Sequence, residues 1–232
     1  MTQWRSFDNQ QDLVDAAVRR IGDAAYAAIS ARGCFNLVLA GGTTPLDCYR
    51  ALAQQTQDFS SWNLYYGDER CLPTGDSMRN STLVEQTGLV ARAGAHYPMA
   101  AELGPIKGAE LYAGLIKTVR PFDMVLLGVG EDGHTASLFP YDMSHWRNVD
   151  DPVIAVSDSP KPPSQRISLN LPVLQDCREM LVLITGAGKH DAVSRWRTGE
   201  TLPIAVVSDI ERAQVFVEQA LLEDASRSTA DV

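Results

Sequence analysis

Asp132 and His134 lie two residues apart in a glycine-rich segment at residues 121–141, PFDMVLLGVGEDGHTASLFPY, and both side chains can take part in acid–base chemistry. An imidazole titrates near neutral pH, so it can accept a proton from water and return it to a leaving group. The apolar residues 125–127 precede the first glycine and indicate a short buried strand of a parallel sheet. Because ligands of open α/β sheets bind beyond the carboxyl ends of the strands, we predict an active site here.

The glycines of this segment also match the G-x-G-x-x-G pattern of dinucleotide-binding proteins, with Gly128, Gly130 and Gly133 in the three positions. In those proteins the pattern opens a helix in the first βαβ unit, and the helix N-terminus binds pyrophosphate. Here Glu131 and Asp132 would place two negative charges against that pyrophosphate. We therefore expect no nucleotide cofactor, and we interpret the glycines as residues that let the backbone turn sharply and approach a ligand.

A second candidate site is the turn at residues 40–45, AGGTTP, which lies between the apolar segment 35–40 and a helical pattern. Its candidate binding groups belong to Gly41, Gly42, Thr43 and Thr44. Glycines expose amide N–H groups, threonines add hydroxyls, and a helix N-terminus favours an anion, so the turn fits a phosphate. The turn lacks the lysine of a P-loop. A plain βα turn, with Thr43 or Thr44 as N-cap and Pro45 in the first helical turn, is the alternative.

Two basic residues are candidates to hold the same anion. Arg166 opens a predicted strand, and Lys189 follows another one. A phosphate dianion favours one bidentate guanidinium and one ammonium, which these two residues supply. Either residue by itself is typical of a solvated surface. The phosphate-type turn at residues 41–44 is what favours a binding role for both.

Asp68, Glu69 and Arg70 form a third charged cluster, directly after the predicted strand at residues 62–66. Three adjacent charges at the end of a buried strand indicate a cleft, because ligands bind at that edge of the sheet. The alternative is a solvated turn with an internal ion pair. We expect the cluster to face the cleft.

Alternating apolar and amphipathic segments place these residues in an α/β fold. We expect helices at residues 10–31, 46–53, 80–89 and 109–119 and through residues 193–196, and strands at residues 35–40, 62–66, 125–127, 153–156, 166–171 and 180–185 and near residue 97. This order predicts a doubly wound, mostly parallel sheet flanked by helices. The proline-rich segment at residues 158–164 is expected to be an ordered loop beside the site, with a disordered linker as the alternative.

The length and composition fit one sizeable α/β domain spanning residues 1–232, with residues 223–232 as a frayed tail. A formal net charge of −9 argues against nucleic acid or an anionic membrane as a partner, because both favour a basic surface. No apolar run approaches the roughly 18 residues of a membrane span, and the N-terminal residues have no apolar segment of the signal-peptide type. The four cysteines contain no C-x-x-C pair, so we expect reduced thiols, no bound metal and a cytoplasmic location.

Five segments in chain order resemble the signature of the 6-phosphogluconolactonase family: LVLAGGTTP, WNLYYGDERCLP, FDMVLLGVGEDGHTASLFP, SPKPPSQRISL and ITGAGKHDAV. They span residues 37–193, and GEDGHTASLFP is highly specific. The family is grouped with glucosamine-6-phosphate deaminase and ribose-5-phosphate isomerase, which have Rossmann-like folds and no nucleotide cofactor. The resemblance implies hydrolysis of 6-phospho-D-glucono-1,5-lactone to 6-phospho-D-gluconate, the second step of the oxidative pentose phosphate pathway, with no cofactor or metal.

The chemistry of lactone hydrolysis assigns roles to the candidate catalytic residues within this resemblance. His134 would be the general base that activates water, and Asp132 would orient or polarise the site. The spacing of Asp132 and His134 does not by itself predict a hydrogen bond between their side chains. Arg70 would stabilise the oxyanion or contact the substrate, and Asp68 would orient polar neighbours.

The substrate phosphate would be held by the turn at residues 41–44, where Thr43 and the glycine amides lie, together with Arg166 and Lys189. One departure from the family pattern concerns the segment that follows the DER residues. The family usually has Ser-Asn there, whereas this chain has Met78-Arg79-Asn80. A capping or substrate role of that serine therefore cannot be carried over.

Two alternative functions remain open. One is an aldose–ketose isomerase or deaminase of the same group, and the other is a non-catalytic sugar-phosphate sensor that could dispense with His134. In the deaminases the corresponding stretch resembles DGHIAFNEP, with a glutamate before the proline that assists the histidine, whereas this chain has Phe139 there. We therefore expect a hydrolase that acts on a small sugar-phosphate lactone, as a monomer or a homodimer.

Overall fold

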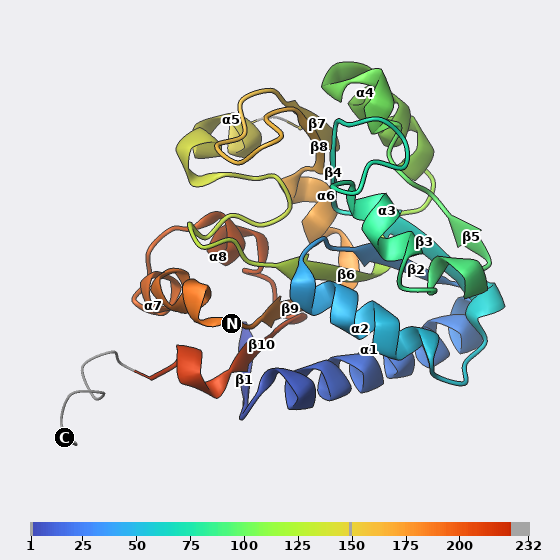
Figure 1. Ribbon diagram of the computed structural model, residues 1–232, viewed down its shortest axis with the longest axis horizontal. Coiled ribbons are helices and arrows are strands. Elements are labelled where there is room, and N and C mark those ends of the chain that lie inside the picture. The colour runs from blue at the N-terminus through green and yellow to red at the C-terminus, as the bar shows by residue number, and fades with distance from the viewer. Residues whose placement is uncertain (1, 149, 224–232) are drawn as a thin grey trace.

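The computed structural model describes residues 2–148 and 150–223, and it centres on a seven-stranded parallel sheet (Figure 1). In spatial order its strands are β1 (Gln3–Phe7), β10 (Ala213–Glu218), β9 (Cys177–Ile184), β6 (Phe122–Gly128), β2 (Phe35–Leu39), β3 (Trp62–Tyr66) and β5 (Ala95–His96). The predicted α/β fold with a mostly parallel sheet flanked by helices is confirmed. Of the tail expected at residues 223–232, residues 224–232 lie outside the described residues.

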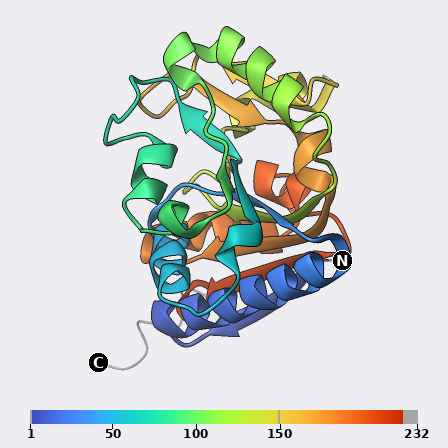
Figure 2. The same ribbon diagram turned by 90° about the vertical axis from the view of Figure 1, so that its right-hand side faces the viewer.

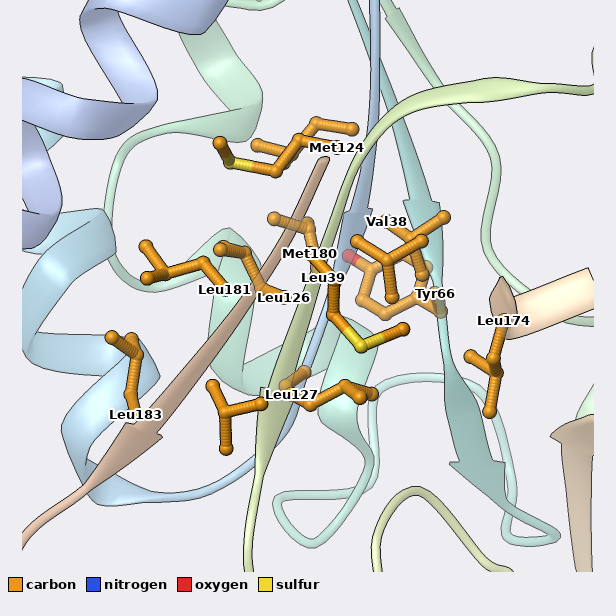
Figure 3. Close-up of a cluster of buried hydrophobic side chains, with 14 of the residues drawn as sticks. Val38, Leu39, Tyr66, Met124, Leu126, Leu127, Leu174, Met180, Leu181 and Leu183 are labelled. Atoms are coloured by element: carbon orange, nitrogen blue, oxygen red, sulfur yellow. The ribbon is translucent and has the colours of Figure 1, made fainter. Parts of the chain in front are cut away.

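The central strands are buried on both faces, which explains why their sequences are mostly apolar. Every residue of β6 before Gly128 is buried. Leu126 of β6 lies opposite Leu181 of β9 in the sheet register. In Figure 3, apolar side chains of β2, β3, β6 and β9 pack together with Leu174, which comes from a helix beside the sheet. β6, the strand that leads into the predicted active-site segment, is therefore held by neighbouring strands on both edges and by apolar packing on both faces.

Two helices cover one face of the sheet, α1 (Gln10–Arg32) and α2 (Thr43–Ala53) (Figure 1). Asn9 caps α1 by accepting a hydrogen bond from the Asp12 amide at 3.0 Å, and Gly33 ends the helix with a positive φ of 80°. The predicted helix at residues 10–31 is confirmed to within one residue. Figure 2 shows this long helix at one end of the molecule and α4 (Pro105–Ile116) at the other.

A second, smaller sheet was not predicted. It is antiparallel and consists of β4 (Asp68–Arg70), β8 (Arg166–Leu169) and β7 (Val153–Val156), with α4 packed against β7 and β8. Its register places Asp68 opposite Ser168 and Arg70 opposite Arg166. The small sheet thus brings Arg166 beside the charged cluster at residues 68–70, nearly a hundred positions away in the chain.

The remaining helical elements are short: α3 (Asn80–Glu85), α5 (Met143–Asn148), α6 (Leu171–Gln175), α7 (His190–Arg197), α8 (Pro203–Val207) and 3₁₀ turns at Phe59–Ser61, Val90–Arg92, Ala101–Leu103, Pro140–Asp142, Ala187–Lys189 and Gln219–Leu221. The helix expected at residues 109–119 is shifted toward the N-terminus, because Gly104 turns the chain and Pro105 starts α4. None of the helices within residues 2–148 and 150–223 is both long and apolar enough to cross a bilayer.

Candidate active site

A cavity of about 580 Å³ lies at the carboxyl edge of the parallel sheet, between that edge and the small sheet. Its walls include every predicted site residue except Asp132: Gly41, Gly42, Thr43, Thr44, Asp68, Arg70, His134, Arg166 and Lys189. Three βα loops contribute, namely those after β2, β6 and β9. The sequence therefore identified the residues that converge on one site, although their distances could not be predicted.

The loop after β6 folds His134 back onto Asp132. The Gly130 amide donates to the His134 carbonyl at 2.8 Å, and Gly133 turns the chain with a positive φ of 85°. This tight turn brings His134 Nδ1 into hydrogen-bonding contact with Asp132 Oδ1. The hydrogen bond that the spacing did not predict is therefore present, and Asp132 lies behind the imidazole instead of lining the cavity.

The charge state of Asp132 follows from its surroundings. Burial by itself would raise the pKa of this carboxyl, but the hydrogen bonds and electrostatic attraction of His134, with a smaller contribution from Lys161, hold the pKa of Asp132 well below its ordinary value. Asp132 is therefore an acceptor for Nδ1 at neutral pH, and His134 Nε2 has no hydrogen-bond partner among the described residues. An imidazole held in this way has Nε2 available for proton transfer.

Asp68 is buried on the other side of the cavity. Its carboxylate accepts hydrogen bonds from Ser137 Oγ at 2.6 Å and from Asn80 Nδ2 at 2.9 Å, and Arg166 Nη1 lies 4.0 Å away. Its neighbour Glu69 is fully buried. The alternative of a solvated turn at these residues is therefore wrong.

Glu69 connects β4 to the start of α3. Its carboxylate accepts hydrogen bonds from the amides of Asn80 at 2.7 Å and Ser81 at 2.8 Å, and Arg79 Nε lies 3.6 Å away. Arg79 occupies the position where the family usually has serine, and it is 2% exposed. Its Nη1 donates to Glu102 at 3.0 Å. In this chain an ion-pair network therefore holds Asn80 beside Asp68.

The turn at residues 41–44 lies where an anion site was predicted. α2 begins at Thr43 with Gly42 as N-cap, and no side chain caps it. The expectation that Thr43 or Thr44 caps the helix is therefore wrong, because Thr44 Oγ1 shares a hydrogen bond with Thr185 Oγ1 at 2.6 Å instead. The first amides of α2 have no acceptor within the helix, so they can bind an anion.

The proline-rich segment at residues 158–164 is an ordered loop beside the cavity, as predicted. The Ser159 amide donates to the Ser164 carbonyl at 3.0 Å, and Lys161 and Pro162 line the cavity. The disordered-linker alternative is wrong. Sequence reasoning missed Lys161 as a cavity residue, although its position in a loop already expected beside the site was a usable signal.

Residues 8–217 match the family model described as glucosamine-6-phosphate isomerases/6-phosphogluconolactonase. The chain belongs to this family. A 6-phosphogluconolactonase of Mycobacterium tuberculosis is 37% identical over 206 residues, covering 81% of this chain and 83% of the relative. The family's member from Streptomyces coelicolor, also named 6-phosphogluconolactonase, is 36% identical over 208 residues, covering 81% and 79%. The resemblance predicted from the sequence motifs is thereby confirmed.

Solved structures of the family agree with the fold. The 6-phosphogluconolactonase of Thermotoga maritima superposes with a TM-score of 0.84 at 28% identity, covering 94% of this chain and all of that one. The enzyme of the same name from Shewanella baltica gives 0.83 at 26%, covering 94% and 97%. A monomeric glucosamine-6-phosphate deaminase gives 0.75 at 17% identity, a likeness of fold.

Proposed function

We propose that this protein hydrolyses 6-phospho-D-glucono-1,5-lactone to 6-phospho-D-gluconate, the second step of the oxidative pentose phosphate pathway. The observation that carries the proposal is that His134, hydrogen-bonded to Asp132, lines one cavity with an anion-type turn at residues 41–44. Membership of the family, and relatives named 6-phosphogluconolactonase, support the same reaction. In this proposal the protein acts in the cytoplasm as a single domain, either as a monomer or as a homodimer.

The proposed reaction begins with water in the cavity. His134 Nε2 takes a proton from the water as its oxygen bonds to the lactone carbonyl carbon, while Asp132 holds Nδ1. Arg70 stabilises the negative oxygen of the tetrahedral intermediate. The bond between that carbon and the ring oxygen then breaks, and His134 returns its proton to the ring oxygen, which becomes a hydroxyl.

The substrate phosphate is proposed to bind at the other end of the cavity. The amides and hydroxyls of the turn at residues 41–44 are suited to an anion, and Arg166 and Lys189 add positive charge. Asp68 keeps Ser137 oriented, since it accepts a hydrogen bond from that hydroxyl. Binding the distant phosphate would fix the lactone carbon near His134, which is the entropic part of catalysis.

The test is the hydrolysis of freshly generated 6-phosphogluconolactone, measured against its spontaneous opening. The protein is expected to accelerate opening, and His134→Ala is expected to lower kcat by about 10²–10⁴, the usual contribution of a positioned general base. A wild-type protein that leaves the spontaneous rate unchanged would refute the proposed activity. A His134→Ala variant as fast as the wild type would refute the role of the histidine.

A further inference from the structure

Arg166 uses most of its guanidinium to hold the neighbouring loop. Its Nε donates to the Pro163 carbonyl at 3.1 Å, and its Nη2 donates to the carbonyls of Lys161 at 3.0 Å and Pro162 at 3.4 Å. The side chain is buried, and Nη1 lies 4.0 Å from Asp68. Only Nη1 is therefore left to contact a ligand, so Arg166 cannot offer the bidentate fork that the sequence predicted.

The loop that Arg166 holds carries Lys161 to the cavity wall, where Lys189 also lies. Ser159 fixes the same loop, because its Oγ donates to the Lys161 carbonyl at 2.9 Å and accepts from the Lys161 amide at 3.3 Å. The side chains of Ser159 and Arg166, on either side of Lys161 in the sequence, thus hold the backbone of Lys161 in place.

Lys161 and Lys189 are two of the four lysines in a chain with a net charge of −9. Burial lowers the pKa of Lys189, and the positive charge of Lys161 lowers it further against the opposing effect of Glu131. Both residues line the cavity, so their ammonium groups can reach the same ligand. Neither forms an ion pair with any residue that the structure describes. Glu131 and Asp132 are the acidic groups that act on these lysines, and neither lines the cavity. Two ammonium groups in one cavity wall favour a ligand with two negative charges.

We infer that Lys161 is a phosphate-binding residue, that Lys161 and Lys189 hold one phosphate dianion between them, and that Arg166 is mainly the positioning residue for the Lys161 loop. The inference refines the proposed function, since it names the cations that contact the substrate phosphate. It also gives the proline-rich loop a purpose: a backbone with few degrees of freedom loses little entropy when its lysine becomes ordered on the ligand.

The experiment compares 6-phosphogluconolactone with unphosphorylated glucono-1,5-lactone and measures the binding of 6-phosphogluconate by calorimetry. Lys161→Met is expected to weaken 6-phosphogluconate binding about 10- to 100-fold, as expected for the loss of one charge-assisted contact. The ratio of kcat/KM for the phosphorylated to the unphosphorylated lactone should fall by a similar factor. Lys161→Arg should restore most of both, and Lys117→Met, at an exposed position after α4, is the matched control.

The positioning role is tested by coupling. Arg166→Lys keeps the charge but replaces the two nitrogens, Nε and Nη2, that contact the loop carbonyls with a single one. Ser159→Ala removes the second support of the loop without touching the guanidinium. Each should lower the same ratio in the wild-type background and have little further effect in Lys161→Met. If either substitution lowered the ratio in Lys161→Met by the same factor as in the wild type, the positioning role would be overturned.

Wild-type 6-phosphogluconate affinity in Lys161→Met would overturn the binding role of Lys161. These outcomes are separable from the proposed activity, because product binding is measured without turnover. A protein that failed to open the lactone yet lost 6-phosphogluconate affinity on Lys161→Met would contradict the proposed hydrolysis and leave the phosphate site supported. If the wild type hydrolysed the lactone and Lys161→Met kept the wild-type phosphate selectivity, the proposed hydrolysis would be supported and the role of Lys161 contradicted.

Discussion

A Cβ atom at position 130 would lie 2.0 Å from His134 Nδ1 and 2.6 Å from Asp132 Oδ1. Gly130 therefore leaves the space in which the imidazole and the carboxylate meet. Its amide also donates to the His134 carbonyl at 2.8 Å, so the same residue closes the turn and makes room for the pair. The contact between His134 and Asp132 therefore depends on the absence of a side chain at position 130.

Gly130→Ala is accordingly expected to lower kcat without abolishing the fold. The new methyl group has to displace His134 or Asp132, and a shift of about 1 Å in a catalytic group can reduce the rate about 10²-fold. Steady-state kinetics with 6-phosphogluconolactone, with 6-phosphogluconate affinity measured in parallel, checks this.

The matched control is Gly114→Ala on the exposed face of α4, where an added Cβ meets nothing within 4 Å. That change should leave kcat unaltered and raise the free energy of unfolding by about 0.5–1 kcal/mol, because alanine is the better helix former. Wild-type kcat in Gly130→Ala would show that the close approach has no bearing on the reaction.

Asp132→Asn is expected to lower kcat by about 10–10³-fold, part of the factor that a positioned base contributes. It should also change the pH dependence of stability. The pKa of Asp132 in the folded protein is held below its ordinary value of 3.8, so the carboxylate stabilises the fold above that pH, and this contribution disappears as the pH falls through the folded-state pKa.

Thermal unfolding of wild type and Asp132→Asn from pH 7 to pH 2 measures this effect. The stability difference should be largest above about pH 5 and shrink below about pH 4. Asp191→Asn, at an exposed carboxylate on α7, is the control and should leave kcat unchanged. A difference that grew toward acid would mean that Asp132 is protonated in the folded protein.

Phosphate affinity should decline at alkaline pH because Lys189 loses its proton early. Burial lowers the pKa of this ammonium below its ordinary value of 10.5, and the charge of Lys161 adds to the effect. The phosphate remains a dianion above about pH 7, so a loss of affinity at higher pH reports on the protein. Calorimetry with 6-phosphogluconate between pH 7 and pH 10 should show binding weaken, and Lys189→Arg should move that weakening to higher pH. An identical profile in the two proteins would remove Lys189 from the phosphate site.

The sequence predicted those elements whose structure is determined by residues close to them in the chain. The apolar run of β6 fixed both a central strand and the position of the turn that follows it. β4 was missed because its three residues are all charged, and their burial depends on partners elsewhere in the chain, such as Ser137 and Asn80. Lys161 was missed for a similar reason, since its place at the cavity is set by Arg166.

The contact between Asp132 and His134 could not be predicted from their spacing either. Two residues that are two positions apart point in different directions in most backbone conformations, and their side chains meet here because the Gly130–His134 hydrogen bond closes a tight turn. Phe139 is the opposite case, because the prediction made from it uses one residue type at one motif position and no knowledge of the fold.

The Phe139 side chain predicts which reaction of the family this protein does not perform. Phe139 is 1% exposed, and its ring lies 4.7 Å from the His134 ring, centroid to centroid. At this position the deaminase stretch DGHIAFNEP has a glutamate that assists the histidine, and an apolar ring cannot relay protons. We therefore expect no ammonia from glucosamine 6-phosphate and no interconversion of aldose and ketose phosphates under conditions in which 6-phosphogluconolactone is hydrolysed. An ammonia-coupled assay and NMR of the sugar phosphates test this, and ammonia release at a rate comparable to lactone hydrolysis would assign the protein to the deaminases instead.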